Sequence, residues 1–97
     1  MNYCIYGAGN NLDIVIEQVA PFLNITGIID NSTKKIGKIV KGIVIQSSDE
    51  FFKNEFSSGN IRIIVSVTKI EARNAIEKDL MSKGLKKGEH FFVAEDI

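Results

Sequence analysis

Residues 3–12 of the chain read YCIYGAGNNL. The first four combine aromatic and β-branched side chains that are apolar on both faces, a pattern typical of a buried parallel strand. Gly7 ends this strand, and Asn10 belongs to the residue types that cap helices. Apolar residues then recur at helical spacing, so we expect a helix from about residue 11 to residues 20–23, where Pro21 disturbs the last turn. The chain therefore opens with a strand, a glycine-rich turn and a helix.

Strands and helices continue to alternate along the rest of the chain. Residues 47–50 and 68–71 each have the form of a capping box, in which a Ser or Thr caps a helix and a later Glu reaches back. The second of these helices is expected to end near Lys83, because Gly84 follows as a stop. Further strands are expected at 25–29, 43–45, 61–67 and 90–93. The residues expected to face the sheet from the last helix are Ile70, Ala72, Ala75, Ile76, Leu80 and Met81.

Residues 33–46 form the least regular part of the sequence. Lysines alternate there with apolar residues, and Gly37 and Gly42 interrupt the segment. We interpret this segment as a loop followed by the short strand 43–45.

This order of elements predicts an α/β protein. Strands that alternate with helices form a parallel sheet with right-handed crossovers and with helices on both faces. We therefore expect a three-layer α/β/α sandwich with a mostly parallel sheet of about five strands. The sequence has no linker, repeat or low-complexity segment, so residues 1–97 are predicted to form a single domain.

The composition is that of an ordinary soluble globular protein, with 44% hydrophobic and 25% charged residues. Twelve Lys and Arg balance twelve Asp and Glu, whereas domains that neutralise nucleic-acid phosphates are usually strongly basic. We therefore expect no nucleic-acid partner. No apolar run reaches the ~20 residues that span a bilayer, and the first residues do not resemble a signal peptide. The sequence thus predicts no membrane span and a cytoplasmic location.

The single cysteine and the single histidine are too few for a catalytic or metal-binding constellation. Cys4 lies in the apolar first strand and is expected to be a buried core residue rather than a redox thiol. His90 starts the last strand and is expected to be a strand-end residue rather than a catalytic base. We therefore predict no catalytic residues and no metal site.

The order of elements also predicts where a ligand would bind. In an open parallel sheet, ligands bind outside the carboxyl ends of the strands, at the point where the strand order reverses. Here that point lies between the first strand and the strand 61–67. The residues that follow the first, second and 61–67 strands are therefore the candidate ligand-binding residues. They are Gly7, Ala8, Gly9, Asn10, Asn11, Asp30, Asn31, Ser66, Val67 and Thr68.

The turn after the first strand has the form Gly7-x-Gly9-x-x-Leu12. Gly7 permits a tight turn, Gly9 lets a phosphate approach the backbone, and the helix N-terminus presents N–H groups to an anion. The full dinucleotide fingerprint has glycine or alanine where this chain has Leu12, so we expect the larger side chain to push helix and strand apart. Asn10 and Asn11 have side chains able to contact a ligand, although capping alone explains Asn10. In the alternative interpretation, the glycines only make a tight turn.

Asp30 follows the second strand, about 20 residues after Gly9, which is the place and spacing of an acid that binds ribose hydroxyls. An Asx turn is the alternative, because Asp-Asn-Ser is a turn sequence in any protein. An acid at this position disfavours a 2′-phosphate. NAD or a nucleotide-sugar is therefore favoured over NADP, and NAD is a candidate cofactor.

Four lysines lie beside this expected site, namely Lys34, Lys35, Lys38 and Lys41. Two interpretations stand at this point: the lysines approach a ligand diphosphate, or they form a solvated surface.

The segments YGAGNN (6–11), TGIIDN (26–31), GKIVKGIVIQSSDEF (37–51) and IRIIVSV (61–67) together resemble a known group of domains. The chain is similar to the small Rossmann-like domains of bacterial cell-surface polysaccharide and glycan biosynthesis. An example is the N-terminal, nucleotide-sugar-binding domain of sugar O- and N-acyltransferases. The resemblance implies a Rossmann-like fold, ligand binding by Gly7, Gly9 and Asp30, and a C-terminal catalytic domain in the full-length protein.

The chain also departs from proteins with related folds. The hexapeptide-repeat domain that carries acyl transfer is missing from these residues, and so is the Tyr-x-x-x-Lys pair of short-chain dehydrogenases, because the two tyrosines are Tyr3 and Tyr6. What the resemblance implies is therefore binding and not catalysis by this chain.

The sequence predicts a nucleotide- or nucleotide-sugar-binding module of a glycan-biosynthesis protein, a domain of a transferase without a catalytic centre of its own. The alternative is an NAD-binding domain of an oxidoreductase or of a nucleotide-sugar dehydratase. A third interpretation is an interaction domain that has kept the fold and lost the site, which the presence of Leu12 in place of the third glycine favours.

Overall fold

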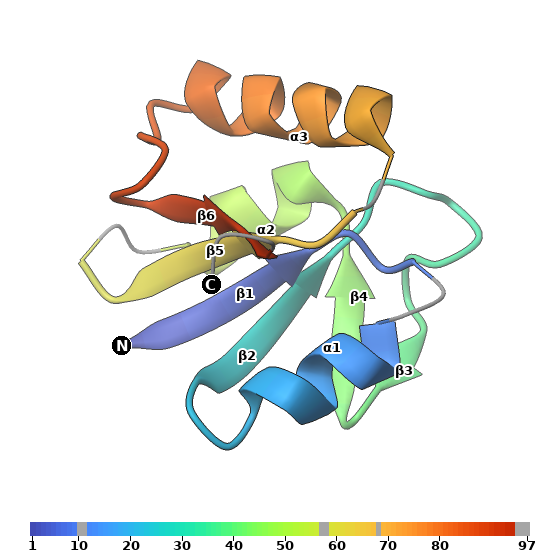
Figure 1. Cartoon of the computed structure of the whole chain (residues 1–97). Coiled ribbons are helices and arrows are strands. Elements are labelled where there is room, and N and C mark those ends of the chain that lie inside the picture. Colours follow the sequence, from blue (N-terminus) through green and yellow to red (C-terminus); the bar gives the residue numbers. More distant parts are fainter. Residues whose placement is uncertain (10–11, 57–58, 68, 95–97) are drawn as a thin grey trace.

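A six-stranded sheet forms the centre of the computed structural model, which describes residues 1–9, 12–56, 59–67 and 69–94 (Figure 1). Its strands are β1 (Asn2–Tyr6), β2 (Asn24–Ile29), β3 (Ile39–Val40), β4 (Ile43–Gln46), β5 (Ile61–Val65) and β6 (Phe91–Val93). Their order across the sheet is β3-β4-β2-β1-β5-β6. Neighbouring strands run parallel except β3 and β4, which form an antiparallel pair.

Helices cover both faces of this sheet. The described residues form α1 (Leu12–Val19), α2 (Ser48–Asn54) and α3 (Ile70–Ser82). Helix α1 packs on one face, whereas α2 and α3 pack on the other (Figure 1). The predicted three-layer α/β/α sandwich with a mostly parallel sheet is confirmed, with six strands where about five were expected.

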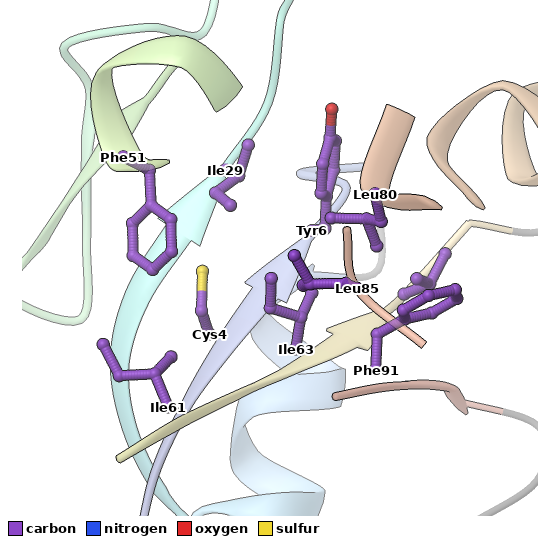
Figure 2. Close-up of a cluster of buried hydrophobic side chains, with 10 residues drawn as sticks. Cys4, Tyr6, Ile29, Phe51, Ile61, Ile63, Leu80, Leu85 and Phe91 are labelled. Carbon is purple, nitrogen blue, oxygen red and sulfur yellow. The ribbon is translucent and has the colours of Figure 1, made fainter. Parts of the chain in front are cut away.

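The alternating side chains of β1 divide the core into two clusters. Ile5 points toward α1 and packs with Leu12 and Ile16. Cys4 and Tyr6 point to the opposite face, into the cluster under α2 and α3 that Figure 2 shows. Cys4 is fully buried, as predicted, and burial raises the pKa of its thiol. The thiol is therefore a core group and not a reactive nucleophile.

The hairpin β3–β4 was not expected, because residues 33–42 were interpreted as a loop. Its two-residue turn consists of Lys41 and Gly42, which both have positive φ, at 51° and 80°. Two-residue hairpin turns require this conformation, and Asn-Gly or Asp-Gly is the sequence that usually indicates it. Because Lys41 stands where Asn or Asp is usual, the turn was not predicted, although the apolar pairs 39–40 and 43–44 flank the turn on both sides.

The ends of the helices follow the predicted signals in part. Ser47 caps α2 as expected, because its Oγ accepts a hydrogen bond from the Glu50 N–H at 3.2 Å. The Glu50 carboxylate instead accepts a hydrogen bond from Asn54 at 3.1 Å. Gly84, with φ of 87°, follows α3 as its predicted stop. Thr68, the predicted cap of α3, lies outside the described residues.

The buried face of α3 differs from the predicted one. Ile76 and Leu80 contact the core as expected. Ile70 and Met81 are 63% and 54% exposed, and the two alanines of the predicted face are also exposed. Glu77 is buried instead, with its Oε1 2.8 Å from the Lys87 ammonium. The apolar pattern therefore predicts the wrong buried face for α3, because Glu77, a carboxylate paired with a lysine, takes a buried position on this helix.

Candidate functional site

The order of strands reverses between β1 and β5, which are direct neighbours in the sheet. This is the place predicted from the order of elements. The residues after β1, β2 and β5 meet at the same edge of the sheet, since the three strands run parallel. Of the candidate ligand-binding residues, Asn10, Asn11 and Thr68 lie outside the described residues.

Gly7 holds the turn after β1 against the end of β5. Its φ is +116°, and a Cβ at this position would lie 2.7 Å from both the Ser66 carbonyl oxygen and the Val67 Cγ1. The Gly7 N–H donates to the Ile29 carbonyl at 2.8 Å, and the Ser66 N–H donates to the Tyr6 carbonyl at 2.9 Å. Glycine is therefore required here both for the backbone conformation and for the close approach of two strand ends. Ser66 and Val67 form the wall against which the turn packs.

Gly9 is the open part of the turn. It is exposed, its φ lies outside the left-handed region, and no atom of a described residue other than its chain neighbours lies within 4 Å of the position of a Cβ. No described residue accepts a hydrogen bond from its N–H. The turn thus offers an N–H group and unfilled space at the N-terminal end of α1, which suits an anion that approaches the backbone closely.

Asp30 lies against this turn and joins the ends of β1 and β2. Its Oδ2 accepts a hydrogen bond from the Ala8 N–H at 2.8 Å. Its Oδ1 accepts one from the Ser32 N–H at 2.8 Å, so the Asx turn of the alternative interpretation is present as well. Each carboxylate oxygen has a further lone pair to offer. The predicted acid and the predicted glycine turn are therefore parts of one structural unit.

The four lysines of residues 34–41 were expected either to approach a ligand diphosphate or to form a solvated surface, and in the structure they divide between the glycine turn and the surface. Lys35 is half-buried and its ammonium donates a hydrogen bond to the Ala8 carbonyl oxygen in the glycine turn. Lys41 lies 3.2 Å from the Glu17 carboxylate on α1, and Lys34 and Lys38 are exposed. One lysine thus approaches the site, and the other three belong to the solvated surface.

Asn31 follows Asp30 but turns toward the helices on the other side of the sheet. Its Nδ2 donates to the Tyr6 hydroxyl at 3.2 Å, and its Oδ1 accepts from the Ser48 N–H at 2.9 Å. The Tyr6 hydroxyl and the Ser48 Oγ both donate to Asp79 Oδ2 at 2.7 Å. These contacts use both groups of the Asn31 amide to fix the segment after β2 to α2 and α3.

This cluster was missed in the sequence, because no local pattern links the first strand to the last helix. The Tyr6 ring lies among apolar side chains with its hydroxyl at their outer edge (Figure 2). Burial raises the pKa of Tyr6 to about 12, and the Asp79 carboxylate acts in the same direction. Partial burial alone would raise the pKa of Asp79, but hydrogen bonds from Lys83, Ser48 and Tyr6 lower it below its ordinary value. At neutral pH the tyrosine donates and the aspartate accepts, so the cluster is a positioning element.

We expect a pH dependence of stability from Asp79. Because its pKa is lower in the folded state than in the unfolded state, its contribution is present above pH ~4 and is lost as the pH falls through the folded pKa. Urea unfolding between pH 6 and pH 3 measures this effect. The wild-type chain should lose free energy of unfolding on acidification more steeply than Asp79→Asn. Parallel curves for the two chains would show that Asp79 contributes nothing.

The structure also describes His90, the surroundings of the possible metal ligands, and the lengths of the helices. His90 accepts a hydrogen bond through Nδ1 from the Lys86 N–H at 2.9 Å, which ties together the loop before β6. Within the described residues, no three His, Cys, Asp or Glu side chains gather closely enough to hold a metal ion. No helix in the described ranges is long and apolar enough to cross a membrane.

No protein-family model matches the chain, and no curated protein matches it. Among solved structures, the chain is similar to RSP, a Rex-family repressor, with a TM-score of 0.67, 20% sequence identity, and coverage of 95% of this chain and 44% of that chain. The chain has a Rossmann-like fold. RSP in complex with β-NADH is similar as well, with a TM-score of 0.61, 19% identity and the same two coverages. The chain thus spans less than half the length of the solved chains that it matches.

These solved structures support the resemblance to the domains of glycan-biosynthesis proteins only in the fold. Neither is described as a glycan-biosynthesis protein, a transferase or an acyltransferase, so the sequence resemblance is supported only in the Rossmann-like fold. The neighbour is described as a repressor, so the expectation that nucleic acid is not a partner gains no support from it.

Proposed function

We propose that the chain is a nucleotide-binding domain whose ligand is NAD(H). The observation that carries this proposal is the hydrogen bond between the Ala8 N–H and the Asp30 carboxylate. It places an acid suited to ribose hydroxyls directly beside a glycine turn suited to a phosphate, in the order in which a dinucleotide presents these groups. The similar fold of RSP, which has been solved with β-NADH, supports NAD(H) as the ligand.

The described residues fit such a ligand. The open space above Gly9 and its N–H would receive the pyrophosphate, and Asp30 would accept hydrogen bonds from the ribose hydroxyls. The end of β5, at Ser66 and Val67, lies where the second half of a dinucleotide would cross the sheet edge. NAD(H), when bound, supplies a hydride donor or acceptor. The role that we assign to these residues is to bind and orient it.

Leu12 is compatible with this proposal. Its side chain is buried with Ile5, Ala8 and Ile16 in the cluster under α1, so the larger residue at the third glycine position is accommodated in the core. The space at Gly9 stays open beside it. If the chain is a domain of a glycan-biosynthesis protein, its ligand would be a nucleotide-sugar, which would use the same turn and acid. Titration with a UDP-sugar and with NADH distinguishes the two ligands.

Asp30→Ala tests the assignment of Asp30. The variant should bind NADH about 5- to 150-fold more weakly, as expected for the loss of hydrogen bonds to a charged group worth ~1–3 kcal/mol. Isothermal titration of both chains with NADH gives this ratio. Circular dichroism should show the same fold, although thermal stability is expected to fall because the Ala8 and Ser32 N–H groups lose their acceptor.

A comparison of ADP with 2′-deoxy-ADP separates ribose binding from this structural role. If Asp30 accepts a hydrogen bond from the 2′-hydroxyl, the substitution should weaken ADP binding more than 2′-deoxy-ADP binding. Equal losses for the two ligands would remove Asp30 from the ribose site and leave it as a support for the turn.

A further inference from the structure

We propose that Lys35 is a positioning residue that orients and polarises the Ala8–Gly9 peptide, so that the Gly9 N–H faces a ligand phosphate. This inference rests on the proposed function, because it assigns the anionic part of the ligand to one peptide of the glycine turn.

The backbone of Ala8 is held at both ends by one short segment of chain. Asp30 accepts from its N–H, and Lys35 donates to its carbonyl oxygen. The segment is itself fixed, because the Ser32 N–H donates to Asp30 and the Lys35 N–H donates to the Ser32 carbonyl at 3.0 Å. A carboxylate and an ammonium are thus presented to the same residue of the turn from fixed positions.

The planarity of the peptide bond transmits this contact to Gly9. In a trans peptide, the carbonyl of one residue and the N–H of the next point in opposite directions. With the Ala8 carbonyl turned toward Lys35, the Gly9 N–H points away from Lys35, and no described residue accepts a hydrogen bond from it. A flipped peptide would present a carbonyl oxygen to the phosphate and would place an N–H against the ammonium. Lys35 therefore disfavours the orientation that would repel an anion.

The ammonium also strengthens the N–H as a donor. A cation on a carbonyl oxygen withdraws electron density along the peptide, and hydrogen bonds in such chains reinforce one another. The effect acts on a negatively charged acceptor far more than on a neutral one. Removal of the charge should therefore weaken the binding of the phosphate groups and leave that of the nucleoside nearly unchanged.

Lys34 provides the matched control. It is the preceding residue and carries the same charge, but it is exposed, whereas Lys35 is half-buried and contacts the turn. A general electrostatic attraction between the lysines and the phosphates would make the two residues nearly equivalent. A role through the Ala8–Gly9 peptide makes them different.

The test is a titration of wild type, Lys35→Met, Lys35→Arg and Lys34→Met with ADP and with adenosine. Lys35→Met should weaken ADP binding about tenfold and adenosine binding by much less, because the Gly9 N–H would be less firmly oriented and a weaker donor to a phosphate. Lys35→Arg should restore most of the affinity for ADP, and Lys34→Met should retain it. The amide resonance of Gly9, observed by NMR without ligand, should shift in Lys35→Met and not in Lys34→Met.

Three results would overturn the inference while the proposed function stands. They are equal losses for ADP and adenosine, equal effects of Lys34→Met and Lys35→Met, and a Gly9 amide resonance that does not shift in Lys35→Met. If the wild-type chain binds neither NADH nor ADP, the proposed function and the inference fail together.

Discussion

Replacing Gly7 by alanine is expected to lower the free energy of unfolding by about 3 kcal/mol, from backbone strain and steric overlap of ~1–3 kcal/mol each. The φ of +116° is a conformation that residues with a side chain rarely adopt, and the new methyl group would lie 2.7 Å from Ser66 and Val67 atoms. The Ser66 atom belongs to the backbone of the adjacent strand end, so the turn and β5 must separate. For a domain of this size, the melting temperature should fall by roughly 10–20 °C.

Gly9→Ala is the control for this prediction, because it makes the same chemical change two residues away in the same turn. The Gly9 φ lies outside the left-handed region, and beyond its chain neighbours the methyl group would meet no atom of the described residues within 4 Å. Its effect on stability should stay within about 1 kcal/mol, since alanine also restricts the unfolded chain. Thermal unfolding followed by circular dichroism measures both variants. Similar melting temperatures for the two would mean that the turn does not pack against β5 as described.

Replacing Gly9 by valine is expected to weaken NADH binding at least about 100-fold while the fold persists. The isopropyl group would occupy the open space that the proposal assigns to the pyrophosphate. A phosphate could then no longer approach the backbone N–H of this residue. Because nothing in the described structure fills that space, the substitution should change the melting temperature little.

Gly59→Val is the matched variant for this second prediction. Gly59 is also exposed, and its φ lies outside the left-handed region. Apart from its chain neighbours, no atom of the part of the chain that the structure describes lies within 4 Å of its Cβ position, but Gly59 lies before β5 at the opposite end of the strand. It should bind NADH as the wild type does. If Gly9→Val binds NADH with unchanged affinity, the ligand does not lie on the glycine turn.

The parts of the fold that depend on local pattern could be predicted from the sequence. The apolar run of β1 and the glycine turn identify a strand followed by a helix, and the alternation of elements identifies a parallel sheet. The position of the strand-order reversal follows from these, and so does the place of Asp30 beside Gly7 and Gly9. These features depend on neighbours in sequence or on topology rules that hold for most parallel sheets.

The remaining features depend on contacts between distant residues or on an unusual residue in a special conformation. The hairpin turn has a lysine at positive φ, where the usual signal is Asn or Asp. The Asn31 amide pairs with Tyr6 and Ser48, which no spacing rule indicates. Lys35 differs from Lys34 and Lys38 in its partial burial and in its contact with Ala8, and neither can be seen in the sequence. Side-chain partners of this kind are set by tertiary packing.

The central claim is that this chain binds NAD(H), and isothermal titration of the unaltered chain with NADH tests it most directly. The predicted result is saturable one-to-one binding of NADH, with no binding of a UDP-sugar at the same concentrations. The absence of NADH binding up to millimolar concentrations, or tighter binding of the UDP-sugar, would contradict the claim.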